Sequence, residues 1–258
     1  MKTTLGQYLP RDSLVHALDA RVKLVVMGLS IGVSFRLDRA GTLVLFALGL
    51  VFCTFISKIS FGDLYRGLKP FIWLFAATAL LHVFMTGGDP LPLVPFATRQ
   101  GLEGGIRVGA QLVLALWVST LTTLTTSSLD MVWAMQWFMR PLKYLNVPTE
   151  EIALAVMLAI RFIPLLFEEA DRITRAQKAR GVDLESGNVF RRTRAMVSVV
   201  VPLMHGAFRR AEDLAVALTL RGYRPGIVRS RMREPRVSLK DGVCTALVCL
   251  WYGFLLAV

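Results

Sequence analysis

The sequence predicts an all-α, polytopic membrane protein with about five transmembrane helices and about three amphipathic helices on its cytoplasmic side. Hydrophobic residues make up 54% of the 258 residues and the mean hydropathy is +0.54, whereas soluble domains are about 45–50% apolar. Residues 1–127 hold long apolar segments with few charges, and residues 128–240 are strongly basic. Apolar segments predict spans, and a basic region beside them predicts cytoplasmic loops.

The net charge of +12 is also typical of nucleic-acid-binding proteins, which carry their basic residues on ordinary globular segments. The long uncharged runs exclude that class, so we expect no nucleic-acid partner. Cys53, Cys244 and Cys249 form neither a C-x-x-C motif nor a cluster with histidine. We therefore expect no metal site and no cofactor. Residues 1–21 contain Pro10 and no apolar core, which argues against a signal peptide.

Four apolar segments before residue 128 predict spans: 22–35, 41–56, 70–86 and 106–126. The first two are short, because a span needs about 20 residues. We interpret them as two membrane helices joined by the R-L-D-R-A-G turn, with one re-entrant hairpin as the alternative. The prolines and glycines of residues 87–105 predict a loop.

The chain thus divides into three predicted regions. Residues 1–127 form a four-helix transmembrane region, residues 128–240 form a cytoplasmic or interfacial region, and residues 241–258 form a C-terminal transmembrane helix. The positive-inside rule places the basic middle region in the cytoplasm. Counting back through four spans puts the N-terminus inside, and counting forward through one span puts the C-terminus outside.

The middle region holds the predicted amphipathic helices. Asp130, or alternatively Ser128, would cap a helix over residues 131–145, and Thr149 would begin the next one. The helix that Thr149 begins is the apolar run 150–167. This run and a second one, 195–208, each contain a proline and are short for spans. The first also contains an arginine, which costs about 2.5–3.5 kcal/mol at a bilayer centre. We therefore expect both inside the protein at the membrane–cytoplasm boundary.

Two polar helices in this region end alike. One runs from Glu168 and stops at Ala179-Arg180-Gly181, and the other stops at Leu220-Arg221-Gly222. The two arginines are 41 positions apart. Glycine suits the left-handed residue that ends a helix, and arginine is favourable at a negative helix end, so ordinary capping explains one copy. Arginine also binds carboxylates and backbone oxygens through its planar guanidinium. Two copies therefore predict two similar docking sites on a partner.

These motifs carry a resemblance to a known family. D-S-L-V-H-A-L-D-A-R-V-K-L at residues 12–24, A-Q-K-A-R-G at 176–181 and R-G-Y-R-P at 221–225 resemble the transmembrane T component of energy-coupling factor (ECF) transporters, which import vitamins and transition-metal ions. That family carries an Ala-Arg-Gly signature at the end of each of two coupling helices. The first copy matches fully. In the second, Leu220 replaces the alanine, which we expect to alter local packing while the arginine is kept.

The resemblance implies a non-catalytic subunit in the bacterial cytoplasmic (inner) membrane. Two cytosolic ABC-type ATPases would each bind one arginine end, and the two helices would transmit ATP-driven motion to a separate substrate-binding membrane subunit, the S component. Methionine side chains are adaptable, and six of them on the amphipathic helices are candidates for the surface that faces the S component: Met131, Met135, Met139, Met157, Met196 and Met204.

Three other functions compete with this interpretation. A conventional ABC permease would bind the substrate itself, but two arginine ends in one chain favour a single copy against two ATPases. A membrane-anchored basic protein would bind nucleic acid or anionic lipid, but 11 acidic residues balance the 19 basic residues of the region 128–240. An intramembrane enzyme would need a catalytic constellation, which the sequence lacks.

Overall fold

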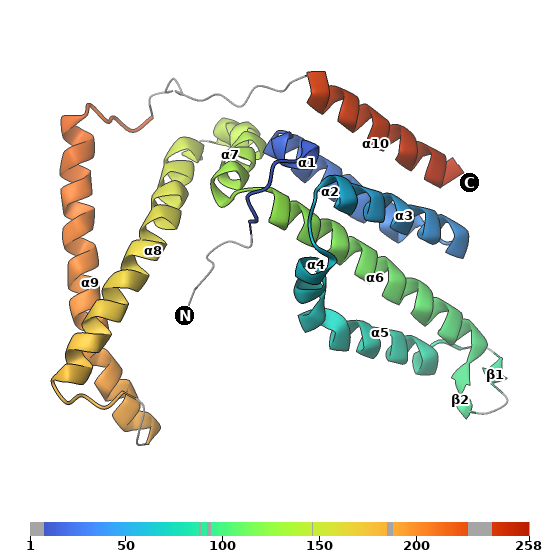
Figure 1. Cartoon of the computed structure of the whole chain (residues 1–258), viewed down its shortest axis with the longest axis horizontal. Helices are drawn as coiled ribbons and strands as arrows, with labels where there is room; N and C mark the ends of the chain where they lie inside the picture. Colours follow the sequence, from blue (N-terminus) through green and yellow to red (C-terminus); the bar gives the residue numbers. More distant parts are fainter. Residues whose placement is uncertain are drawn as a thin grey trace. The chain divides into compact units, whose positions relative to one another are not determined.

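The computed structural model describes residues 8–87, 89–91, 94–145, 147–184, 188–226 and 239–257. It confirms the all-α fold, with one small hairpin in addition. The elements are α1 (Leu14–Ala17), α2 (Ala20–Arg36), α3 (Ala40–Ile56), α4 (Phe61–Leu68), η1 (Lys69–Phe71), α5 (Ile72–Met85), β1 (Pro90–Leu91), β2 (Val94–Thr98), α6 (Arg99–Thr125), α7 (Ser128–Met139), η2 (Arg140–Leu145), α8 (Thr149–Ala179), α9 (Val189–Leu220) and α10 (Leu239–Ala257) (Figure 1). Contacts divide the chain into two compact units, residues 1–135 with 233–258, and residues 136–232.

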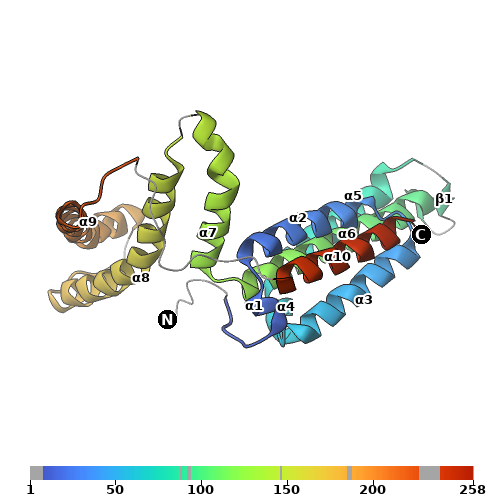
Figure 2. The ribbon, with the colours of Figure 1, turned by 90° about the horizontal axis from the view of Figure 1, so that it is seen from above.

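The first unit is a bundle arranged around α6. Helices α2, α3, α5 and α10 lie on the other four segments predicted to span, and the five helices run along one another in Figure 2. Among the described residues, the stretches Phe61–Met85 and Arg99–Thr125 are long and apolar enough to cross a membrane, and Ala40–Ile56 and Asp241–Ala257 are shorter apolar helices. These helices fit a helical membrane protein.

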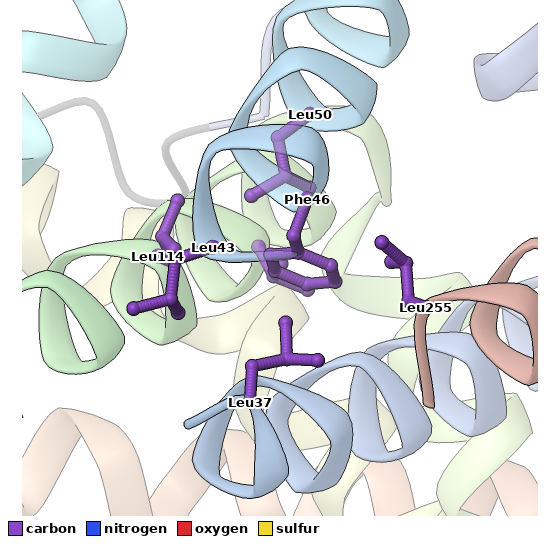
Figure 3. Packing of buried hydrophobic residues seen from close by; sticks show 7 residues of the cluster. Leu37, Leu43, Phe46, Leu50, Leu114 and Leu255 are labelled. Atoms are coloured by element: carbon purple, nitrogen blue, oxygen red, sulfur yellow. The ribbon is translucent and has the colours of Figure 1, made fainter. Parts of the chain in front are cut away.

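The core of this unit lies where α3, α6 and α10 meet (Figure 3). Phe46 of α3 is only 2% exposed and points between leucines of the neighbouring elements. The cluster consists of Leu37, Leu43, Phe46, Leu50, Leu114, Val118 and Leu255. The buried amide of Gln111 in α6 also has a partner and donates to the carbonyl of Leu37 at 2.9 Å. Such pairing offsets the cost of burying an amide.

The prediction of a loop over residues 87–105 is wrong from Arg99 onward, because α6 begins at that residue. The hydroxyl of Thr98 accepts a hydrogen bond from the Gly101 amide at 3.2 Å and so caps the helix. A Cβ atom at Gly101 would lie 2.5 Å from the carbonyl oxygen of His82, and one at Gly105 would lie 2.7 Å from that of Ala79. These glycines therefore allow α5 and α6 to approach closely, which periodicity alone did not reveal.

The N-terminal arm, residues 8–23, packs against the C-terminal end of α6. The Leu9 amide donates to the carbonyl of Leu124 at 3.1 Å. The ring of His16 lies 3.0 Å from the Leu9 carbonyl and 2.7 Å from the Ser13 hydroxyl. Burial lowers the pKa of His16, so its ring is neutral at pH 7. Because a carbonyl can only accept, Nε2 carries the proton and Nδ1 accepts from the serine.

Lys23 holds this arm to the bundle. Its side chain is buried, and Nζ donates to the carbonyls of Thr125 at 2.9 Å and His16 at 3.1 Å. We expect Lys23→Met to lower the free energy of unfolding by about 2–4 kcal/mol, because two carbonyls lose their donor. Thermal unfolding of the purified protein in detergent measures the change. Lys69→Met, at an exposed lysine, is the control, and an equal shift for both variants would contradict this role.

The second unit is built on two long helices. The predicted segments 150–167 and 168–179 are one helix, α8, which continues through Pro164. Likewise α9 continues through Pro202, so the segment 195–208 is not a separate helix. A proline removes one hydrogen bond from the ladder and kinks a helix without necessarily ending it. At 31 and 32 residues, each helix is about 47 Å long.

The start of α7 also differs from the prediction. Neither Asp130 nor Ser128 is the capping residue, because the Ser127 hydroxyl accepts from the Asp130 amide at 3.2 Å and donates to its carboxylate at 2.6 Å. The helix ends at Met139, and residues 140–145 form the 3-10 helix η2. The change of helix type falls at Arg140-Pro141, where proline cannot supply an amide proton.

Candidate partner-docking site

The first arginine end, residues 179–182, closes α8 with a glycine in the left-handed conformation. Gly181 has φ +85°, a value that costs glycine little and other residues more. Its amide donates to the carbonyl of Lys178 at 3.0 Å, and the Val182 amide donates to that of Gln177 at 3.0 Å. This pair of bonds defines a Schellman motif, which fixes Arg180 as the residue at the helix tip.

The second arginine end, residues 220–223, closes α9 in the same way. Gly222 has φ +75°. Its amide donates to the carbonyl of Thr219 at 2.9 Å, and the Tyr223 amide donates to that of Leu218 at 2.9 Å. The same two bonds recur at equivalent positions, so Arg221 stands at its helix tip as Arg180 does. The two ends therefore share one backbone geometry, including the glycine conformation that the sequence predicts.

Both arginines at the tips are exposed. Within the residues that the structure describes, neither guanidinium forms a salt bridge with an acidic side chain. Leu220, which stands where the first end has alanine, is 83% exposed. The leucine thus adds apolar surface at the second end. Each end offers five N–H donors in a planar group, an arrangement suited to carboxylates or carbonyl oxygens on another molecule.

Helices α8 and α9 cross at an ion pair. Arg210 donates to Glu169 at 2.8 Å, and Arg172 lies 3.7 Å from the same carboxylate oxygen. Glu169 precedes Arg180 by 11 residues, and Arg210 precedes Arg221 by 11 residues. At 1.5 Å per residue, each tip lies about 16 Å along its helix from the crossing. The C-terminal ends of α8 and α9 lie apart in Figure 1, so the two arginines stand on separate arms of equal length.

This ion pair gives a test of the crossing. We expect Glu169→Arg or Arg210→Glu to destabilise the α8–α9 pair by about 1 kcal/mol, since both side chains are partly exposed and solvent weakens the attraction. Exchanging the two residues in one protein should restore most of the loss. Thermal unfolding in detergent measures both effects. Glu168→Arg, at the exposed neighbouring position, makes the same charge change; a loss as large there would contradict the pairing.

Basic residues lie on both sides of the first arginine end in the sequence. The last two turns of α8 and the first two turns of α9 contribute six exposed side chains: Arg172, Arg175, Lys178, Arg191, Arg192 and Arg194. Cations in the first turn of a helix oppose its dipole and cost a few tenths of a kcal/mol each. The positive potential at this end would attract an acidic partner surface.

The six methionines are distributed over three helices. Met131, Met135 and Met139 lie on α7, Met157 lies on α8, and Met196 and Met204 lie on α9. Three of them are exposed: Met135 by 62%, Met196 by 56% and Met204 by 48%. The methionines of α9 accompany larger exposed apolar side chains on the same helix. Among the described residues, no three His, Cys, Asp or Glu side chains form a group that could hold a metal ion.

The Glu169–Arg210 crossing pair was not predicted from the sequence. Glu169 and Arg210 are separated by the same 41 residues as the two tip arginines, and this shared offset was the available signal. It indicates that α8 and α9 contact each other at equivalent positions. The offset alone did not show which residues meet, because many pairs in these helices share it.

Over most of its length the chain is similar to a known protein family and to individual known proteins. The profile of the family described as CbiQ, cobalt transport protein, matches residues 11–233. The chain is 36% identical to the energy-coupling factor transporter transmembrane protein EcfT of Clostridium kluyveri, over 97% of this chain and 98% of the relative. It is 40% identical to EcfT of Thermanaerovibrio acidaminovorans, over 96% and 93%, and 39% identical to EcfT of Bacillus subtilis, over 95% and 94%.

Proposed function

Because this chain belongs to the CbiQ family, as a transmembrane component of energy-coupling factor transporters, we propose that it couples two cytosolic ATPases to a substrate-binding membrane subunit. The observation that carries the proposal is the pair of arginine ends, with one backbone geometry and equal distances from the α8–α9 crossing. Equivalent ends on separate arms suit two equivalent sites, one on each ATPase of a pair.

The crossed helices suit the transmission of motion. If the two ATPases move on binding ATP, the arginine ends are displaced with them and the crossed helices α8 and α9 move as a pair. The parts of both helices on the other side of the crossing then move as well, because a helix of this length transmits displacement along its axis. This subunit itself carries out no chemistry in the cycle; ATP hydrolysis belongs to the partners.

Exposed apolar side chains support a membrane partner for these helices. They lie on both α8 and α9, and a soluble protein rarely leaves so many large ones uncovered. The side chains are Leu165, Phe167, Met196, Val197, Val200, Val201, Met204 and Phe208. We assign them, with the other four candidate methionines, to contact with the S component. The transported substrate is then a vitamin or a transition-metal ion, selected by that component.

The orientation in the bacterial cytoplasmic membrane follows from charge. We place the N-terminus and residues 128–240 in the cytoplasm and the C-terminus outside, because basic segments remain on the cytoplasmic side. The apolar helices of the first unit face the lipid bilayer and the membrane partner. In this orientation both arginine ends meet cytosolic ATPases. A cysteine introduced at exposed Arg224 should be labelled by membrane-impermeant reagents only from the cytoplasmic side, in a variant without native cysteines.

Purification of the tagged, full-length protein from native membranes tests the proposal. We expect it to retain two ATPase subunits per chain together with one further membrane subunit, and the reconstituted complex to take up substrate only with ATP. Recovery without any ATPase would overturn the proposal. A complex of this chain with ATPases that transports with no further membrane subunit would instead identify a conventional permease.

A further inference from the structure

The chain beyond the second arginine end returns to the start of α8. The amide of Gly226 donates to a carboxylate oxygen of Glu151 at 2.7 Å, a contact between residues 75 positions apart. Gly226 has φ +80°, a conformation that side chains other than glycine's adopt at a cost. This hydrogen bond joins a point five residues beyond Arg221 to the first turn of α8.

The same region contains a second link and a small cavity. Lys143 of η2 pairs with Glu150, the residue before Glu151. A cavity of about 220 Å³ lies between these side chains, the Val147–Pro148 segment and Gly226. The two adjacent glutamates thus have different partners: Glu150 contacts the segment before α8, and Glu151 contacts the segment after α9. The Glu151–Gly226 hydrogen bond thus connects the start of α8 to the segment after α9.

Together with the crossing ion pair, this hydrogen bond closes a triangle. One side runs along α8 from Glu151 to Glu169, which is 18 residues or about 27 Å. A second side runs along α9 from Arg210 to Arg221, about 16 Å. The third side is the short Tyr223–Gly226 segment, fixed to α8 by Glu151. Because the sides of a triangle determine its angles, this closure constrains the angle at which α9 crosses α8.

We propose that Glu151 is a positioning residue for Arg221: by accepting from the Gly226 amide, it fixes the crossing angle and so the placement of the second arginine end. That the placement of Arg221 affects ATPase docking rests on the proposed coupling function. Without the Glu151 carboxylate, α9 can rotate about the Glu169–Arg210 pair. Arg221 then reaches its docking site in fewer of the orientations that α9 adopts.

Spin-label distances test the geometry directly. In a variant without native cysteines, labels on cysteines at exposed Ala176 and Ala217 report the separation of the two arginine ends. We expect Glu151→Ala to broaden this distance distribution, and Glu151→Gln to leave it narrow, because an amide oxygen still accepts from Gly226. Glu150→Ala, which breaks only the contact with Lys143, is the matched control. An unchanged distribution in Glu151→Ala would overturn the proposal.

A double-mutant cycle tests the consequence for docking. We expect Glu151→Ala to weaken binding of the ATPase pair about fivefold in the wild-type and Arg180→Ala backgrounds, and to have no further effect with Arg221→Ala. An equal loss in all three backgrounds would indicate general destabilisation and contradict the positioning role. If neither arginine change affects docking, the coupling function fails, while the spin-label distances still decide whether Glu151 sets the crossing angle.

Discussion

Replacing both Arg180 and Arg221 by alanine is expected to abolish co-purification of the ATPases and ATP-dependent uptake. Both guanidinium groups are exposed at helix tips of identical geometry. Arginines that anchor an interface commonly contribute about 2 kcal/mol or more, so each single change should weaken docking about 30-fold. The two ends are on separate arms, so their effects should add and the double change should weaken docking about 1,000-fold.

Matched variants make this prediction specific. Arg209→Ala in α9 removes an exposed arginine from the same helix as Arg221 but leaves the tip intact, and it should dock ATPases nearly normally. Lysine at positions 180 and 221 keeps the charge without the planar guanidinium. We expect those variants to fall between wild type and alanine. Normal ATPase recovery and uptake by the double alanine variant would rule out the assigned docking role.

The second large effect is expected where α5 and α6 touch. Gly105→Ala would place a methyl group 2.7 Å from the Ala79 carbonyl oxygen, and Gly101→Ala would place one 2.5 Å from that of His82. These atoms belong to the helical backbone of α5, so the helices must separate. Overpacking of this kind costs about 1–3 kcal/mol per site. We expect the double variant to lose most of its folded yield in the membrane, because folded proteins have small stability margins.

Gly109 provides the control in the same helix. A methyl group there would lie 4.0 Å from the Cβ atom of Ala79, which is ordinary van der Waals contact. Gly109→Ala should therefore be neutral or stabilise α6 by up to about 1 kcal/mol, because alanine has the higher helix propensity. Thermal unfolding in detergent and the amount of protein in membranes measure all three variants. Equal behaviour of Gly105→Ala and Gly109→Ala would show that α5 and α6 are not in close contact.

Local features were predictable where local chemistry decides them. Apolar segments predicted the helices of the first unit, because the length and composition of a segment decide whether it can cross a bilayer as a helix. Gly181 and Gly222 were expected to end helices, and both adopt positive φ. The resemblance carried by residues 12–24 and by the two arginine ends identified the family that the profile and the relatives establish. Assignment of the arginine ends and the methionines to particular partners remains a prediction.

Errors arose where contacts between distant residues override local preference. The glycines at 101 and 105 resemble loop residues in sequence, but they lie in α6 because α5 approaches them. The runs 150–167 and 195–208 were expected as separate short helices, but α8 and α9 extend beyond them and continue through Pro164 and Pro202. Each proline removes one backbone hydrogen bond, and the hydrogen bonds of the other turns keep the helix continuous. Ser127, not Asp130 or Ser128, caps α7, because its hydroxyl accepts a hydrogen bond from the Asp130 amide.

By itself, the sequence determined an all-helical membrane protein of the ECF family with two arginine-tipped helices. Spacing, charge and glycine content carry that information, because capping and apolar periodicity act over a few residues. Only the tertiary structure decided that the tips are equally distant from the Glu169–Arg210 crossing and that Glu151 ties α9 back to α8. Contacts between residues 41 and 75 positions apart depend on how whole helices pack, which no local pattern specifies.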